Sequence, residues 1–118
     1  MLPEAANTLP KKERLNGKKD ISALLAGGKW GSVGCLRYCS KPNDLEYSRI
    51  VVSVPKRLFK RAVKRNLLKR RIREAYRSSK HLLDAHPQDI LFQYISPEIA
   101  DFMEVRLSVE GILKKLAK

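Results

Sequence analysis

The chain has 118 residues, enough for one domain with one compact core, and 43% of them are hydrophobic. Its 25 Lys and Arg against 12 Asp and Glu give a net charge of +13 at pH 7, which favours a polyanionic partner. No apolar run approaches the length of a membrane span, and the N-terminus lacks the apolar segment of a secretory signal. We therefore expect a cytoplasmic protein that does not bind membranes.

The first quarter of the chain predicts one short helix. Residues 1–13 are polar and contain two prolines, so we expect them to be flexible and poorly anchored. Asn16 or Gly17 opens a helix over residues 18–26, and Gly27-Gly28 ends this helix as a C-cap.

Two strands are predicted next, over residues 32–40 and 46–54, with a turn at 41–44 between them. Their closeness in the chain predicts an antiparallel hairpin. The only cysteines, Cys35 and Cys39, fall in the first strand and too far apart for a disulfide with each other. We interpret both as reduced thiols and not as zinc ligands.

The second half of the chain predicts a helix, a strand and a last helix. Residues 61–79 contain no Gly or Pro and are predicted to form a helix, and residues 89–95 are predicted to form a strand. Ser96 as N-cap and Pro97 at the first helical position predict a helix over 97–116. The order helix, strand, strand, helix, strand, helix indicates an α+β domain in which helices cover a small sheet.

The positive charge is concentrated in residues 56–77. This segment holds eleven Lys and Arg and a single acid, Glu74, so it carries +10 of the net charge. At 3.6 residues per turn, one stripe of its helix is apolar and consists of Leu68, Ile72, Ala75 and Ser79. The opposite stripe consists of Asn66, Lys69, Arg70, Arg73 and Arg77. A face kept only for solubility usually mixes both signs, so this stripe predicts a polyanion-binding surface, with a merely solvated basic face as the alternative.

The same helix contains a spaced set of motif residues, namely Ala62-Val63, Arg65-Asn66, Lys69-Arg70 and Arg73-Glu74-Ala75-Tyr76-Arg77. This set closely resembles the signature helix of the bacterial ribonuclease P protein component, and the order of elements follows that family over about residues 9–116. Three positions depart from the family pattern. Leu67 stands where Arg is usual, Arg71 where an apolar residue is more frequent, and Ile21 where Phe is usual. The missing Phe weakens the expectation of base stacking beside the first helix.

The resemblance implies a fold that periodicity alone does not predict. It implies a two-layer α/β sandwich with a small mixed sheet and an extra strand in the early hairpin region. The basic helix would then form a left-handed βαβ crossover between parallel strands, against the usual right-handed rule. The whole chain, residues 1–118, would form a single RNA-binding domain.

The resemblance also implies the activity. In this family the protein supports Mg²⁺-dependent 5′ maturation of precursor transfer RNA, and the RNA subunit holds the reactive centre and most of the Mg²⁺. The partners implied are the ribonuclease P RNA and precursor transfer RNA, with no obligate protein partner. The sequence agrees with catalysis by the RNA subunit, because it contains no nucleophile–base pair and no metal-ligand spacing. We interpret His81 and His86 as solvated side chains. We therefore expect no catalytic residue in the protein.

Two groups of residues are predicted to contact RNA. The catalytic RNA would be bound through its phosphates by Lys56, Arg57, Lys60, Arg61, Lys64, Arg65, Asn66, Lys69, Arg70, Arg73 and Arg77. The resemblance places the single-stranded 5′ leader in a sheet groove beside the first helix, and the candidates there are Lys12, Arg14, Arg37, Tyr38, Tyr47 and Arg49. For those on strands, an ordinary half-buried role is an equal alternative.

Two aromatic residues have different expected environments, and three other functions are alternatives to the one implied by the resemblance. Tyr76 is expected to pack against the sheet, whereas Trp30 fits either a core position or an RNA-stacking ring. The main alternative function is a ribosomal or other structural RNA-binding protein without a role in processing. A DNA-binding regulator lacks a second helix for a helix-turn-helix, and a membrane-surface helix would need a larger apolar stripe.

Overall fold

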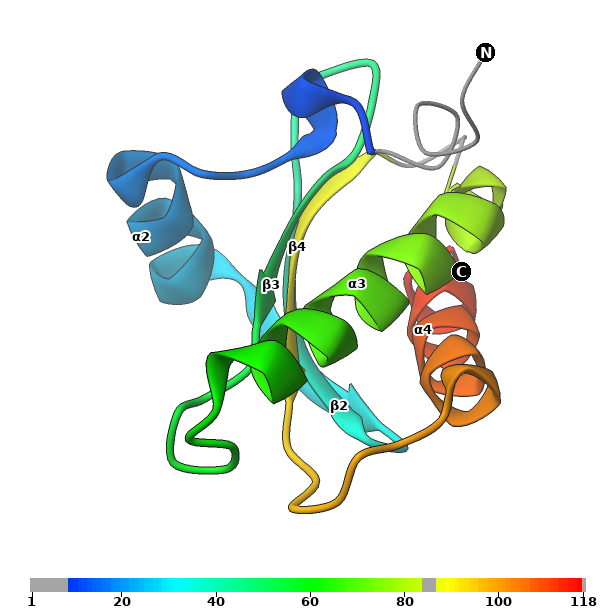
Figure 1. Ribbon diagram of the computed structural model, residues 1–118. Helices are drawn as coiled ribbons and strands as arrows, with labels where there is room; N and C mark the ends of the chain where they lie inside the picture. The colour runs from blue at the N-terminus through cyan, green and yellow to red at the C-terminus, as the bar shows by residue number, and fades with distance from the viewer. Residues whose placement is uncertain (1–8, 84–86, 118) are drawn as a thin grey trace, which may run out of the picture.

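The computed structural model describes residues 9–83 and 87–117. The elements are η1 (Lys11–Glu13), α2 (Lys18–Gly27), β1 (Lys29–Val33), β2 (Leu36–Pro42), β3 (Arg49–Ser53), α3 (Ala62–Ser79), η2 (Lys80–Leu83), β4 (Gln88–Tyr94) and α4 (Phe102–Leu116). The helices α3 and α4 cover one face of the sheet, and α2 lies against the other (Figure 1). This is the α+β fold expected from the sequence.

The sheet is mixed, with strand order β1-β2-β4-β3. The strands β1 and β4 both pair antiparallel with β2, whereas β3 and β4 are parallel and are joined by α3. The predicted hairpin of residues 32–40 with 46–54 is wrong, because β4 lies between β2 and β3. Six of the seven β4 residues are buried, so this late strand belongs in the centre. The early hairpin is β1 with β2, and Gly34 makes its turn at φ 57°.

The main core lies between the sheet and the α3–α4 layer. Leu68, Ile72 and Ala75 on α3 are fully buried, which confirms the predicted apolar stripe. Tyr76 is also buried, and its ring packs on Phe92 of β4 with centroids 6.1 Å apart, as expected for a residue that faces the sheet.

A second, smaller core lies under α2. Leu15, Leu24, Cys39 and Leu91 are buried together there. Cys35 lies in the β1–β2 turn and belongs to the main core instead, so the two thiols are on opposite faces of the sheet, and both are free. Burial raises the pKa of the Cys35 thiol, and burial also raises that of Cys39 against a smaller opposing effect of Arg37.

The first helix begins and ends as predicted, but the last one does not. Gly17 and Gly28 are the caps of α2. The helix α4 begins at Phe102, where the Asp101 carboxylate accepts a hydrogen bond from the Glu104 amide at 2.9 Å. The Tyr94 hydroxyl holds the preceding loop, since it accepts from the Ala100 amide at 2.8 Å and donates to the Glu98 carbonyl. These local bonds from the end of β4 replace the helical turn that was expected after residue 96.

The described part of the N-terminal segment is well anchored. Leu9 is only 4% exposed and belongs to the main core. Glu13 is buried and accepts hydrogen bonds from the Lys80 ammonium at 3.0 and 3.2 Å. The Leu15 amide donates to the Ile50 carbonyl at 2.7 Å, beside β3. Residues 1–13 were expected to be flexible; residues 9–13 make these contacts with the rest of the domain, and residues 1–8 lie outside the described part. In the described chain, no helix has the length and apolar character of a membrane span.

Replacing Ile72 by Ala removes a side chain that is fully buried between α3 and the sheet. We expect the free energy of unfolding to fall by about 2 to 5 kcal/mol, the usual cost of truncating a buried Ile. Urea denaturation measures this change. Glu74→Ala on the exposed side of the same helix is the control and should change stability by less than about 0.5 kcal/mol. Equal effects of the two variants would contradict the orientation of α3.

The two thiols should react slowly in the folded protein. Their raised pKa values lower the fraction of thiolate, which is the nucleophile, and burial limits access to both. A thiol-specific disulfide reagent at about pH 8 should label both cysteines slowly in buffer and rapidly in denaturant. Labelling of either residue in buffer at the rate of an unstructured peptide would show that its core is open.

Candidate RNA interface

The cationic stripe of α3 faces away from the core. Because the apolar stripe is buried against the sheet, Asn66, Arg70 and Arg73 are exposed, and Lys69 and Arg77 are half-buried. Within residues 9–83 and 87–117, no carboxylate forms an ion pair with any α3 cation; the ion pairs present involve Arg49, Lys80 and Arg106. The Nε atom of Arg77 is buried without a hydrogen-bond partner. The stripe is therefore a positive surface that the protein does not neutralise itself.

The segment before α3 extends this surface. Lys56, Arg57, Lys60 and Arg61 are exposed in the loop that leads into the helix. Arg65 fixes this loop, because its guanidinium donates to the carbonyls of Phe59 and Lys60, each at 2.8 Å. Arg65 was predicted only as an RNA contact, but its Nη1 already donates hydrogen bonds to backbone carbonyls of the protein. The Phe59 ring, in the same loop as these cations, is buried beside Tyr94 and so holds the loop backbone in place.

Arg71, one of the departures from the family pattern, has an intramolecular role. Its Nη1 donates to the carbonyl of Ala100 at 2.5 Å. This bond links the middle of α3 to the loop before α4. The guanidinium therefore satisfies a carbonyl in the α3–α4 layer, on a different side of the helix from the cationic stripe.

A cleft brings Arg73 close to Arg14. It has a volume of about 230 Å³, and its lining also includes Ile21, Asn16 and Val51. Burial, and then the charge of Arg14, lower the pKa of Arg73, although an arginine stays charged at neutral pH. The structure thus joins a residue predicted for the leader, Arg14, to one predicted for the catalytic RNA.

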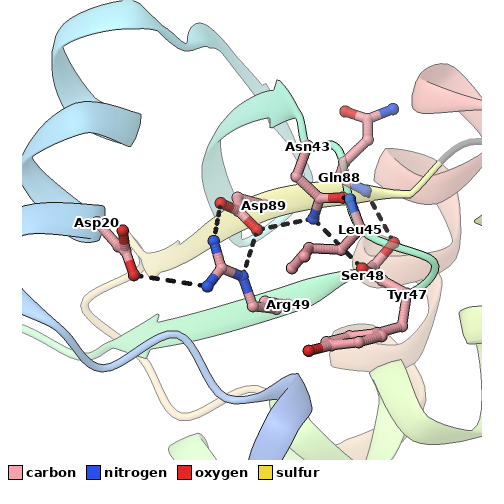
Figure 2. Close-up of polar contacts among 8 residues, drawn as sticks. All are labelled: Asp20, Asn43, Leu45, Tyr47, Ser48, Arg49, Gln88 and Asp89. Carbon is pink, nitrogen blue, oxygen red and sulfur yellow. Dashed lines mark hydrogen bonds and ion pairs between the residues drawn. The ribbon is translucent and has the colours of Figure 1, made fainter.

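Arg49 is neutralised within the protein. Figure 2 shows its guanidinium between two carboxylates. It donates to Asp89 through Nε at 2.9 Å and through Nη2 at 2.7 Å, and to Asp20 at 3.5 Å. Hydrogen bonding to Asp89 is the main cause that raises the pKa of Arg49. The bidentate pair with Asp89 ties β3 to β4, and the contact with Asp20 ties β3 to α2. Arg49 therefore has carboxylate partners within the protein.

The predicted tyrosines do not line the groove beside α2. Tyr38 is 8% exposed and lies in the main core, on the opposite face of the sheet, because neighbouring strand residues point to opposite faces. Tyr47 precedes β3, and the Lys12 ammonium lies 4.8 Å from the centre of its ring. Tyr47 and Lys12 line a separate cleft of about 280 Å³, together with the buried Glu13 and its half-buried partner Lys80.

Arg37 does lie on the groove face, and it lies there with Trp30. The guanidinium carbon of Arg37 is 4.1 Å from the centre of the Trp30 ring, which is 43% exposed. The sequence left the role of Trp30 open, because a single ring on an edge strand has no periodic signal that separates a core position from an exposed one.

No group of three or more His, Cys, Asp and Glu side chains is placed to hold a metal ion within residues 9–83 and 87–117. His81 is exposed, and His86 lies outside the described residues.

The family model described as Ribonuclease P matches residues 9–117. A ribonuclease P protein component from Porphyromonas gingivalis strain W83 is 38% identical over 118 residues, covering 92% of this chain and 86% of the relative. The one from Nitrosomonas europaea is 38% identical over 76 residues, covering 64% of each chain.

Solved structures agree with the sequence relatives. The ribonuclease P protein of Staphylococcus aureus superposes with a TM-score of 0.77 at 26% identity and covers 90% of this chain and 95% of its own. That of Thermotoga maritima has a TM-score of 0.77 at 28% identity, with 87% and 96% covered. The chain therefore belongs to the family of bacterial ribonuclease P protein components, the protein subunits of the ribonucleoprotein endoribonuclease that processes transfer RNA.

Proposed function

We propose that this protein acts as a single RNA-binding domain that contacts two RNAs at once. The basic surface, defined as the loop of residues 56–61, Lys64, Arg65 and the cationic stripe of α3, binds phosphates of the ribonuclease P RNA. The sheet face beside α2 binds the single-stranded 5′ leader of precursor transfer RNA. We propose that the complex works in the cytoplasm without an obligate protein partner, and that the RNA supplies the catalytic Mg²⁺ chemistry.

One observation carries the proposal for the basic surface. Within the described residues, the cations of α3 have no carboxylate partner, although the chain has acidic side chains and uses them elsewhere. Arginine forks match phosphate oxygens in a bidentate geometry and keep their charge. Phosphate contacts fix position and affinity but carry little sequence information, which suits a protein that must dock on a folded RNA.

The Arg14–Arg73 cleft supports simultaneous contact with both RNAs. Arg73 belongs to the cationic stripe, whereas Arg14 follows η1 on the side of α2, and both line the same cleft. Two guanidinium groups that repel each other are stabilised by a phosphate placed between them. We propose that the leader and the catalytic RNA approach each other at this cleft.

Removing two arginines should weaken binding and flatten its salt dependence. The variant Arg70→Ala/Arg73→Ala should bind the ribonuclease P RNA roughly tenfold or more weakly per arginine, because a hydrogen bond to a charged group contributes about 1.5 to 3 kcal/mol. The slope of log K against log salt should fall by about 1.4 to 1.8, the value for two phosphate contacts. Filter binding over a range of salt concentrations measures both quantities.

The matched control for this variant is Lys114→Ala/Lys115→Ala. It removes the same charge from the exposed last turn of α4, which is not part of the basic surface. Its affinity should change only slightly and its slope should stay near that of the unchanged protein. If both variants lost affinity equally, net charge rather than the α3 stripe would be responsible.

The protein should also lower the Mg²⁺ concentration that cleavage needs. At low Mg²⁺ the phosphates of the two RNAs are poorly screened, and the cations of the basic surface replace part of this screening. Cleavage of precursor transfer RNA by the ribonuclease P RNA should therefore rise when the protein is added. Arg70→Ala/Arg73→Ala should need far more protein for the same rate. A rate at low Mg²⁺ that does not depend on the protein would count against the proposal.

A further inference from the structure

The loop before α4 and the first turns of α4 expose a group of apolar side chains. Half of the exposed large hydrophobic residues of the described chain lie in residues 95–107. They are between 39% and 60% exposed and are Ile95, Ile99, Met103 and Leu107. Met103 and Leu107 are one turn apart and so share a face of the helix. Single exposed hydrophobic residues are normal, but a group of them with a polar rim typically marks a protein interface.

The rim of this apolar group is acidic, although the chain as a whole carries +13. Residues 95–105 contain three acids, Glu98, Asp101 and Glu104, and no Lys or Arg. All three are exposed, and none forms an ion pair within residues 9–83 and 87–117. We call the four apolar residues and these three acids the acidic patch. Its charge repels both RNA phosphates and anionic lipid headgroups, so it suits a basic protein surface with an apolar centre.

The beginning of α3 has this complementary character. Val63 is 78% exposed, the highest value among the exposed large hydrophobic residues of the described chain. Its neighbours Lys60, Arg61 and Lys64 are exposed as well. We call these four residues the basic knob. The basic knob has an apolar centre and a positive rim, whereas the acidic patch has an apolar centre and a negative rim.

Both surfaces lie at the same end of the molecule, which is the lower end in Figure 1. Phe59, just before the basic knob, packs on Tyr94 at the end of β4, with ring centroids 5.9 Å apart. Arg71 of α3 donates to the carbonyl of Ala100 in the loop before α4. These contacts hold the two surfaces side by side, so that this end of the molecule is complementary to a second copy of itself. About a two-fold axis, the basic knob of each copy meets the acidic patch of the other, and the contact forms twice.

We propose that two copies of this chain form a two-fold symmetric dimer through this end of the molecule when no RNA is bound. Val63 of each copy packs on the apolar side chains of the other copy's acidic patch, and the charges around it pair across the interface. Complementary charges fix the register of such a contact, and the closed symmetry stops assembly at two copies. The contact surface is small, so the association is weak and reversible.

The dimer excludes the catalytic RNA from part of its proposed binding surface. The basic knob contributes Lys60, Arg61 and Lys64 to the basic surface, and in the dimer these cations face carboxylates instead of phosphates. The dimer is therefore a form of the protein without RNA, in which Val63 and the apolar side chains of the acidic patch are covered. Binding of the ribonuclease P RNA then separates the two copies.

Sedimentation velocity of the RNA-free protein over a range of concentrations tests the proposal. The unchanged protein should show a monomer–dimer equilibrium without larger species. Glu98→Lys/Glu104→Lys should weaken the dimer roughly tenfold or more, because each reversed charge acts in both copies of the contact. The control Asp44→Lys/Glu46→Lys makes the same change of net charge at exposed positions between β2 and β3, at the opposite end of β4. It should leave the dimer nearly unchanged.

A mixture of two variants gives the sharpest outcome. Lys60→Glu/Lys64→Glu alone should also be monomeric, because like charges then face each other across the interface. Mixed in equal amounts with Glu98→Lys/Glu104→Lys, it should form a dimer with one copy of each variant, since every contact again joins opposite charges. All four substituted side chains are exposed, so the fold is retained. A mixture that stays monomeric, or an unchanged protein that stays monomeric at every concentration, would overturn the proposal.

The dimer is measured without RNA, so its absence leaves the proposed function untouched. Glu98→Lys/Glu104→Lys should keep full affinity for the ribonuclease P RNA, because neither acid belongs to the basic surface. Addition of that RNA to the unchanged protein should replace the dimer by complexes that contain one protein copy. If the RNA bound the intact dimer, the basic knob would not lie in the interface and the assignment would be wrong.

Discussion

Burial of the apolar stripe of α3 against β4 is the interaction on which the rest of the structure depends. Leu68 and Ile72 are fully buried there, and each such side chain contributes about 1.5 to 3 kcal/mol. Repulsion between like charges one turn apart costs only a few tenths of a kcal/mol per pair. Packing therefore decides the orientation of the helix, and the cations on its other side must face solvent. Because no cation of α3 forms an ion pair within the described residues, this repulsion remains for a polyanion to relieve.

The central position of β4 decides which face of the sheet α3 covers, so the two faces of the sheet differ. Because β4 lies in the centre of the sheet, α3 must cross one face to join β3 to it, and α4 covers the same face (Figure 1). The other face receives only α2, which covers one apolar row. One face is thus closed by two helices and carries the basic surface on its outside. The other stays partly open and displays Trp30 and Arg37.

Two of the three residues that depart from the family pattern, Arg71 and Ile21, have contacts in the structure that account for them. Arg71 donates to the Ala100 carbonyl and so stabilises the loop before α4, which explains a cation beside the core. Ile21 packs with Leu24 in the small core under α2, where an aliphatic side chain fits without an aromatic ring. Arg49 was a reasonable cationic candidate by composition, but Asp89 lies directly beside it in the parallel register of β3 with β4. A charge in a sequence reveals nothing about such a partner forty residues away.

The sequence by itself determined most of the helices and strands, the apolar and cationic stripes of α3, and the family, because these depend on local periodicity and on spaced motif residues within one helix. It also placed the caps of α2, where glycines act through the local backbone. It did not separate β1 from β2, since the Gly34 turn falls inside the strand predicted over residues 32–40. Only the tertiary structure decided the strand order, the late start of α4 and which charged side chains are already paired. The strand order and the paired charges depend on contacts between distant segments, such as Arg49 with Asp89. The start of α4 depends on the Tyr94 hydroxyl, whose bonds to residues 98–100 no helical pattern in the sequence indicates. The same holds for Trp30, since exposure on an edge strand follows from which row α2 covers and not from the neighbours of Trp30 in the chain.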